Sequence, residues 1–381
     1  MPYNLLALGS NGGYQLGVGD NKDRHSAVPS EFEINGEIQR NIGGEVVQVA
    51  CGGEHTLLLL ADGHLLASGS NEQSQLFSSV RKTSDHFKVF RTIESLADRK
   101  FKLVSCGWEY SVAITTDDKI LVSGYGPNGE LGLGKPIMST KGADDGYTAI
   151  PFEEAAKRGG IKKIKGSIHS TIIQLGNGEV WGWGNNKKGQ LFDTDGELES
   201  RIVWKPTLLE FRNHAKVLDF AMARDFSVFI LRDQAGVIRK VFRGKDNYDI
   251  GDDLHDVRLD EDTLENIQAM WTSVHVITKD KSIRSFGNNS HSQISPRRDV
   301  HPDKYRMGSE HGLCIVDERK VFAWGWGEHG NCGEHSDDKK EKDDVTFDYC
   351  NEIYEAGEGE RVVNVFGGCA TSFIEVERKN S

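Results

Sequence analysis

The sequence has no Cys-x-x-Cys pair, no long apolar run and no basic cluster at either end. Six scattered cysteines do not suggest a zinc site built by this chain, and free thiols fit a reducing compartment. The longest aliphatic run, Leu57 to Ala61, is too short to cross a bilayer, and no signal peptide is recognisable. We therefore expect a cytoplasmic and nuclear protein that contacts no membrane and needs no metal or other cofactor.

Acidic residues outnumber basic ones, 58 to 46. The formal net charge is −12, and such a field repels a polyanion. The chain starts Met1-Pro2-Tyr3-Asn4, without a basic tail, and its last residues are too few to supply one. Direct binding to DNA is therefore not expected.

Catalytic signatures are missing as well. The sequence has no Gly-x-Ser-x-Gly element around a serine nucleophile. The glycine-rich stretch from Gly9 to Gly13 lacks the lysine of a phosphate-binding loop. We expect a protein that is not an enzyme and has no catalytic residues.

What the chain does have is a repeat. Seven times a short apolar strand runs into a glycine, which is followed six residues later, in most copies, by Gln, Asn or Glu. These anchor glycines are Gly9, Gly69, Gly124, Gly184, Gly244, Gly287 and Gly325. Repeats at such spacing indicate an architecture of similar small units.

A second element, the landmark, precedes most anchors. It reads Cys-Gly-Gly-Glu-His at 51–55 and Cys-Gly-Trp-Glu-Tyr at 106–110, with weaker copies at 164–170 and 306–312. Turn pairs such as Asp62-Gly63 lie between landmark and anchor and favour tight hairpins. Each unit is therefore expected to be a small antiparallel sheet.

The two ends of the chain carry complementary halves of a unit. Residues 5–17 contain an anchor without a landmark, and residues 362–375 contain a landmark without an anchor. Joined, they complete a seventh unit and leave no free sheet edge. The sequence thus predicts an all-β, seven-bladed β-propeller of four-stranded antiparallel blades, closed by its terminal segments. One propeller domain is expected over 1–376, with a short polar tail at 377–381.

The paired signatures resemble the regulator-of-chromosome-condensation repeat, and the resemblance covers roughly residues 3–376. The motif is clear in the first four units and around Trp324-Gly325. It is degraded in the fifth unit, at 243–251, and in the sixth landmark, at 269–273.

Equivalent turns of successive blades emerge on one face of a propeller, so the landmark turns should form a rim. The positions after the landmark glycine combine tryptophans with four acids, a composition suited to binding a protein because aromatic residues dominate interface hot spots. The predicted partner-binding residues are Glu54, Trp108, Glu109, Arg224, Asp225, Trp271 and Glu310. The alternative is that the acids only solvate the rim and the tryptophans fill the central channel.

Other recurrent residues are expected to be structural. His55, His169 and His311 share one repeat position and should each form hydrogen bonds within their own blade. The anchor-strand tryptophans at 181, 183, 324 and 326 should pack between blades. The acidic insertion 249–262 and the mixed-charge run 337–344 are expected to be solvated, mobile loops. A short helix is expected at 153–158.

A ring without a catalytic cluster points to a binding scaffold that is a monomer on its own. The family resemblance leaves two main alternatives open. One is a guanine-nucleotide exchange factor for a small GTPase. The other is an adaptor similar to the fungal killer-toxin-insensitivity proteins, also called alpha-tubulin suppressors.

The adaptor resemblance implies a heterodimer with a small acidic zinc protein of the Cys-Ser-Leu type, in the service of Elongator-dependent tRNA wobble-uridine modification and diphthamide synthesis. An acidic rim suits such a partner poorly, so contacts through tryptophans or through Arg224, Arg243 and Lys245 are expected. A ubiquitin-ligase specificity subunit or a vesicle-trafficking factor is a third interpretation.

Overall fold

The protein is a seven-bladed β-propeller, as the repeats predict. The computed structural model describes residues 3–80, 84–135, 137–192, 201–212, 215–294, 300–335 and 345–378. Contacts divide the chain into two compact units, which we describe separately. Unit 1 comprises Met1–Glu72, Thr83–Lys100 and Asn288–Ser381, and unit 2 comprises Gln73–Lys82 and Phe101–Gly287.

Unit 1 contains blades 1, 2 and 7. Blade 1 is formed by β27 (Glu360–Gly367), β28 (Thr371–Arg378), β1 (Tyr3–Gly9) and β2 (Arg24–Pro29). Blade 2 is formed by β5 (Val46–Cys51), β6 (His55–Leu60), β7 (Leu65–Ser70) and β8 (His86–Thr92), and it is extended by the hairpin of β3 (Phe32–Ile34) and β4 (Glu37–Gln39). Blade 7 is formed by β23 (Lys304–Met307), β24 (His311–Val316), β25 (Lys320–Trp326) and β26 (Thr346–Glu355). A 3-10 turn, η1, covers Glu94–Leu96.

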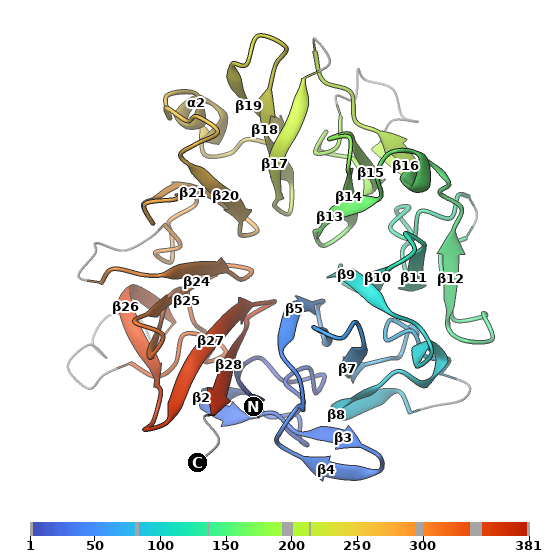
Figure 1. The fold of residues 1–381 in the computed structure, drawn as a ribbon, viewed down its shortest axis with the longest axis vertical. Coiled ribbons are helices and arrows are strands. Elements are labelled where there is room, and N and C mark those ends of the chain that lie inside the picture. Colours follow the sequence, from blue (N-terminus) through green and yellow to red (C-terminus); the bar gives the residue numbers. More distant parts are fainter. Residues whose placement is uncertain are drawn as a thin grey trace. The chain divides into compact units, whose positions relative to one another are not determined.

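Blade 1 joins the two ends of the chain. Strand β1 pairs along its whole length with β28, so that Tyr3 faces Glu377 and Gly9 faces Thr371. Figure 1 shows the N and C marks beside this sheet. The pairing confirms the expected closure, although β28 extends to Arg378, two residues into the segment predicted as a tail.

Unit 2 contains blades 3 to 6. Blade 3 is formed by β9 (Phe101–Cys106), β10 (Tyr110–Thr115), β11 (Ile120–Gly124) and β12 (Tyr147–Ile150). Blade 4 is formed by β13 (Ile161–Gly166), β14 (Ser170–Leu175), β15 (Val180–Asn185) and β16 (Ile202–Leu208). Blade 5 has β17 (Lys216–Met222), β18 (Phe226–Arg232) and β19 (Ile238–Gly244), and blade 6 has β20 (Leu264–Ala269), β21 (Ser273–Thr278) and β22 (Ile283–Gly287).

Blades 5 and 6 thus show three strands each within the described residues, whereas the other five sheets have a fourth. Two short helices lie in unit 2. α1 (Glu154–Lys157) falls inside the segment expected to be helical. α2 (Ile250–His255) occupies the acidic insertion that was expected to be a mobile loop. That expectation was wrong because Ile250 and Leu254 are buried in the core that blades 5 and 6 share. The run 337–344 lies outside the described residues.

The backbone geometry at the anchor positions explains why all seven repeats have a glycine there. All seven have φ between +101° and +120°, and an added Cβ would lie 2.2–2.7 Å from the carbonyl oxygen at the end of the landmark turn of the same blade. A larger residue would be strained by this backbone conformation, and its Cβ would clash with the nearby carbonyl oxygen.

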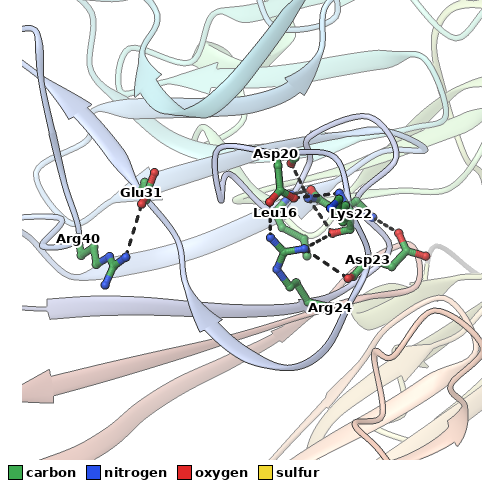
Figure 2. Close-up of polar contacts among 8 residues, drawn as sticks. Leu16, Asp20, Lys22, Asp23, Arg24, Glu31 and Arg40 are labelled. Atoms are coloured by element: carbon green, nitrogen blue, oxygen red, sulfur yellow. Dashed lines mark hydrogen bonds and ion pairs between the residues drawn. The ribbon is translucent and has the colours of Figure 1, made fainter.

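The polar residues of the anchor motif fold the loop that follows. In blade 1 the Asn11 side chain accepts a hydrogen bond from the Leu16 amide at 3.0 Å, and Gln15 Oε1 accepts one from Gly13 N at 2.8 Å. Asn186 and Gln190 do the same in blade 4. Figure 2 shows the rest of the blade 1 loop, where Arg24 pairs with Asp20 at 2.6 Å. Local side-chain bonds of this kind fold the loop, and Ser68 Oγ of blade 2 adds a bond to Tyr14 O at 2.7 Å.

Candidate protein-binding surface

The landmark turns share one backbone hydrogen bond, which defines equivalent positions. The amides of Gly52, Gly107, Ser167, Ala223, Met270, Gly308 and Gly368 each donate to the carbonyl three residues later. In blade 4 the residue that donates this bond is Ser167. It lies one position after Gly166, the glycine that the repeat pattern had matched to Gly52 and Gly107. Ile168 and His169 are therefore the blade 4 equivalents of Trp108 and Glu109.

This register corrects the expectation for the histidines. His169 is not equivalent to His55 and His311, because it takes the position that Glu54 and Glu109 occupy. Nor do the hydrogen bonds stay within one blade. His311 Nε2 lies 2.9 Å from Ser372 Oγ of blade 1, and His169 Nδ1 lies 3.0 Å from Glu130 Oε1 of blade 3. Burial lowers the pKa of His311 to about 4, so it joins the two blades as a neutral ring.

Within unit 2 the structure brings the two rim tryptophans together. Trp108 of blade 3 and Trp271 of blade 6 have ring centroids 6.2 Å apart at an angle of 51°. Trp108 is 43% exposed, which is unusual for so large an apolar side chain. Backbone bonds between successive turns hold the pair: Trp108 N donates to Ile168 O at 2.9 Å, and Arg224 N donates to Trp271 O at 3.1 Å.

The charged rim residues differ from one another. Arg224 and Asp225 pair with each other at 3.1 Å, Glu109 is half-buried, and Glu54 is exposed in unit 1. Glu310 departs from the expectation of an exposed rim acid. It is only 6% exposed, and its Oε2 accepts a hydrogen bond at 3.1 Å from Gln293, the glutamine of the blade 6 anchor motif.

Three exposed apolar residues of blade 3 were not recognised from the sequence. Tyr125, Ile137 and Met138 lie in the loop that follows the blade 3 anchor. Tyr125 N donates to Glu109 O at 2.9 Å, and Gly126 N donates to Met138 O at 2.8 Å, so the loop is fixed next to the landmark turn. We call Trp108, Trp271, Tyr125, Ile137 and Met138 the aromatic surface.

A signal for Tyr125 was present in the repeat. The residue after each anchor glycine is small or polar in five units, and Tyr125 and Trp326 are the two aromatic exceptions. Trp326 is 36% exposed, but its ring stacks on His291 of the blade 6 anchor loop with centroids 4.7 Å apart, so it packs between blades as predicted. Trp183 and Trp324 are buried, and each donates its indole N–H to a carbonyl of the preceding blade's anchor loop.

In the described part of the chain, no three His, Cys, Asp or Glu side chains are grouped to bind a metal ion. Among the same residues, neither helix has the length and apolar character that a bilayer-spanning segment requires.

The geometry is that of a repeat-built β-propeller in which the landmark turn of blade 3 presents an exposed tryptophan, Trp108. Models of the regulator of chromosome condensation (RCC1) repeat match residues 4–59, 46–75 and 177–230. These matches, together with a full-length relative that carries the same repeats, support an RCC1-repeat propeller family.

Known proteins agree with this assignment. The chain is 26% identical to an RCC1 repeat-containing protein of Schizosaccharomyces pombe over 99% of both sequences. It is 27% identical to the mouse secretion-regulating guanine nucleotide exchange factor, over 87% of this chain and 64% of that protein. Its fold matches Prp20p of Saccharomyces cerevisiae, described with its binding to Gsp1p and histones, with a TM-score of 0.76 at 16% identity over 100% of this chain and 93% of that one.

Proposed function

We propose that this protein is a non-catalytic scaffold that binds another protein through the aromatic surface. The single observation that carries the proposal is the Trp108–Trp271 pair, which is partly exposed and rigidly held by backbone bonds between landmark turns. Tryptophan and tyrosine dominate the binding energy of protein interfaces, and a pre-ordered pair loses little entropy when a partner binds.

We further propose that the partner is a small zinc-binding protein of the Cys-Ser-Leu type, and that the heterodimer acts as an adaptor in Elongator-dependent tRNA wobble-uridine modification and diphthamide synthesis. The similarity to an RCC1 repeat-containing protein of Schizosaccharomyces pombe over 99% of both sequences supports a role for the propeller itself. An apolar surface also suits an acidic partner better than the charged rim does, because contact through indole rings avoids like-charge repulsion.

Co-purification of the full chain with the zinc protein, followed by titration calorimetry, tests the proposal. Trp108→Ala and Trp271→Ala should each weaken binding by about thirtyfold, the effect of losing one hot-spot residue. Trp326→Ala is the matched control, since it removes an exposed tryptophan outside the aromatic surface. If no complex forms at micromolar concentration, the zinc partner is wrong. If a complex forms and both variants bind as tightly as the parent, the aromatic surface is wrong.

A guanine-nucleotide exchange factor is the second candidate, favoured by the similarity to the mouse exchange factor. In this case the surface would grip a small GTPase and accelerate release of its nucleotide. Release of a fluorescent GDP analogue from a panel of small GTPases provides the test. Acceleration that Trp108→Ala abolishes would favour this function over the adaptor.

A further inference from the structure

The chain contains four Asn-Gly pairs, which begin at Asn11, Asn35, Asn128 and Asn177. Such a pair is chemically labile, because glycine has no side chain that would hinder its backbone nitrogen from attacking the side-chain amide of the asparagine. Hydrogen bonds to that amide, or from that nitrogen, restrain the two reacting groups. The differences in these bonds among the four pairs therefore decide which pair can react.

Two of the pairs have asparagine side chains that are held at both ends. Asn11 is buried, its Nδ2 donates to two carbonyl oxygens of its own loop, and its Oδ1 accepts from Leu16 N at 3.0 Å. Asn128 Nδ2 donates to Glu130 Oε1 at 3.0 Å, and Asn128 Oδ1 accepts from Lys187 Nζ at 2.8 Å. Neither amide can turn toward the following glycine without losing these bonds.

In a third pair the attacking nitrogen is engaged as well. Asn177 Oδ1 accepts from Glu179 N at 3.0 Å, and Gly178 N donates to Leu175 O at 2.9 Å. Asn177 is exposed, so water reaches it. The restraint on this pair comes from hydrogen bonds alone, which makes it the matched reference for an exposed pair.

The fourth pair, Asn35-Gly36, has none of these bonds. Neither the Asn35 side chain nor the Gly36 amide makes a hydrogen bond with a described residue. Both residues are exposed, and a Cβ added at Gly36 would meet no atom within 4 Å. The two reacting groups are thus unrestrained by neighbours and open to water.

This pair forms the tip of the β3–β4 hairpin. Asn35 has a φ of 54° and Gly36 a φ of 80°, and Ile34 faces Glu37, as in a two-residue type I′ turn. The backbone must rotate out of this turn before the two groups can meet. Opening is easy here, because all three residues of β4 are exposed and β4 is the last strand of its sheet. Figure 1 shows the hairpin at the outer edge of that sheet.

We propose that Asn35 is a site of spontaneous deamidation. The Gly36 nitrogen attacks Cγ of Asn35, a C–N bond forms, and the side-chain nitrogen leaves as ammonia with the Gly36 amide proton. Water then opens the resulting five-membered imide at one of its two carbonyl carbons. Opening at Cγ gives aspartate. Opening at the main-chain carbonyl gives isoaspartate, in which the backbone runs through the former side chain.

The products should release β4 from its sheet. Both carry a new negative charge between Glu33 and Glu37, and like charges weaken the pairing of two strands. Isoaspartate also adds a carbon atom to the main chain, which the two-residue turn does not accommodate. The change should stop at β4, because Phe32 of β3 is buried and β3 also pairs with β8. The modification does not depend on the aromatic surface or on its partner.

The test follows all four pairs in the full chain at neutral pH. Peptide mass mapping measures the conversion of each asparagine, and labelling by an isoaspartate methyltransferase identifies the isoaspartate product. Asn35 should convert about tenfold faster than any of the other three, and in urea the four rates should become similar because the restraining bonds are lost. The proposal is overturned if another pair converts as fast as Asn35 in the folded chain. It is also overturned if Asn35 persists in the folded chain while it converts in urea.

Two variants separate the new charge from the altered backbone. Asn35→Gly keeps the turn, since glycine adopts a positive φ, but it cannot form the imide and should abolish the methyltransferase label. Asn35→Asp adds the charge without an extra main-chain carbon. Hydrogen exchange at the β4 amides should accelerate about tenfold in the isoaspartate product and less in Asn35→Asp, with β8 unchanged in both. A label that persists in Asn35→Gly would overturn the assignment of the site, and unchanged exchange at β4 would overturn the release of the strand.

Discussion

Of the buried carboxylates that join blades, Asp219 and Glu375 have opposite surroundings. Asp219 of unit 2 is fully engaged. Its Oδ1 accepts from Phe220 N at 2.7 Å and pairs with Lys163 Nζ of blade 4, and its Oδ2 accepts from Ile267 N of blade 6 at 3.0 Å. One side chain therefore links three blades, and a cation balances its charge.

Glu375 of unit 1 is only half satisfied. Its Oε1 accepts from Val46 N of blade 2 at 2.6 Å, but among the described residues its buried Oε2 has no hydrogen-bond partner. Lys304, the counterpart of Lys163, donates at 2.8 Å to Asn364, which follows a β-bulge in β27 as Asp219 does in β17. Burial, with a smaller contribution from Glu45, raises the pKa of Glu375 to about 7, against the opposing effects of Val46 N, Asn364 and Lys304.

The comparison teaches that position in the repeat does not determine the charge at a blade junction. Asn364, a neutral residue, stands in unit 1 at the position that Asp219 has in unit 2. The buried acid of unit 1 is Glu375 on the neighbouring strand β28, and Lys304 donates its hydrogen bond to Asn364. A buried carboxylate in that situation favours its protonated form.

Removing the satisfied carboxylate should have the largest effect. Asp219→Ala leaves Lys163 without its partner and two amides without an acceptor, so the free energy of unfolding should fall by about 3 kcal/mol. Urea denaturation measures it. Asn364→Ala, at the equivalent position, is the matched control and should cost about 1 kcal/mol. Equal losses would show that the two junctions do not differ.

The pH dependence of stability should distinguish Glu375. Its folded pKa of about 7 exceeds the ordinary value of 4.5, so the folded protein holds more protons than the unfolded chain within that window. This group's contribution to stability therefore falls as pH rises from 4.5 to 7, by on the order of 3 kcal/mol.

Glu375→Gln should remove this pH dependence of the unfolding free energy and stabilise the protein at pH 8. Glu377→Gln, which removes a carboxylate paired with Arg361, should destabilise it at the same pH. The interpretation is contradicted if Glu375→Gln destabilises the protein at pH 8.

The smallest effect is expected when unit 1 is made to resemble unit 2. Asn364→Asp supplies Lys304 with an anionic partner, a gain of about 1 kcal/mol below pH 6. The new carboxylate also opposes ionisation of Glu375, so the pH window of that residue should move upward. Unfolding free energies measured from pH 5 to 9 would reveal the shift, and a downward shift would contradict it.

The blade structure was predictable from sequence because its signals are local. The side chains of Asn11 and Gln15 accept hydrogen bonds from backbone amides five and two residues away, and the same bonds recur in blade 4. The turn of blade 4 was misplaced by one residue because the defining feature is the bond from Ser167 N to Ser170 O, which no glycine marks.

The candidate surface was less predictable because exposure depends on neighbouring blades. The sequence placed Trp108 and Trp271 at equivalent positions, and in the structure their ring centroids lie 6.2 Å apart. It could not show that Gln293 would reach Glu310 from another blade and bury it. The exposure of Tyr125 likewise depends on the path of the loop after its anchor.

The pairing of β1 with β28 also affects how the protein is made. β1 leaves the ribosome long before β28 is synthesised. The backbone groups of β1 that bind β28 therefore stay unpaired until β28 has formed. Every contact of this pair spans nearly the whole polypeptide, which delays its formation relative to the hairpins of the other blades. During synthesis the apolar strand Leu5–Leu8 thus remains incompletely covered, and it is the segment of blade 1 at which chaperones would act.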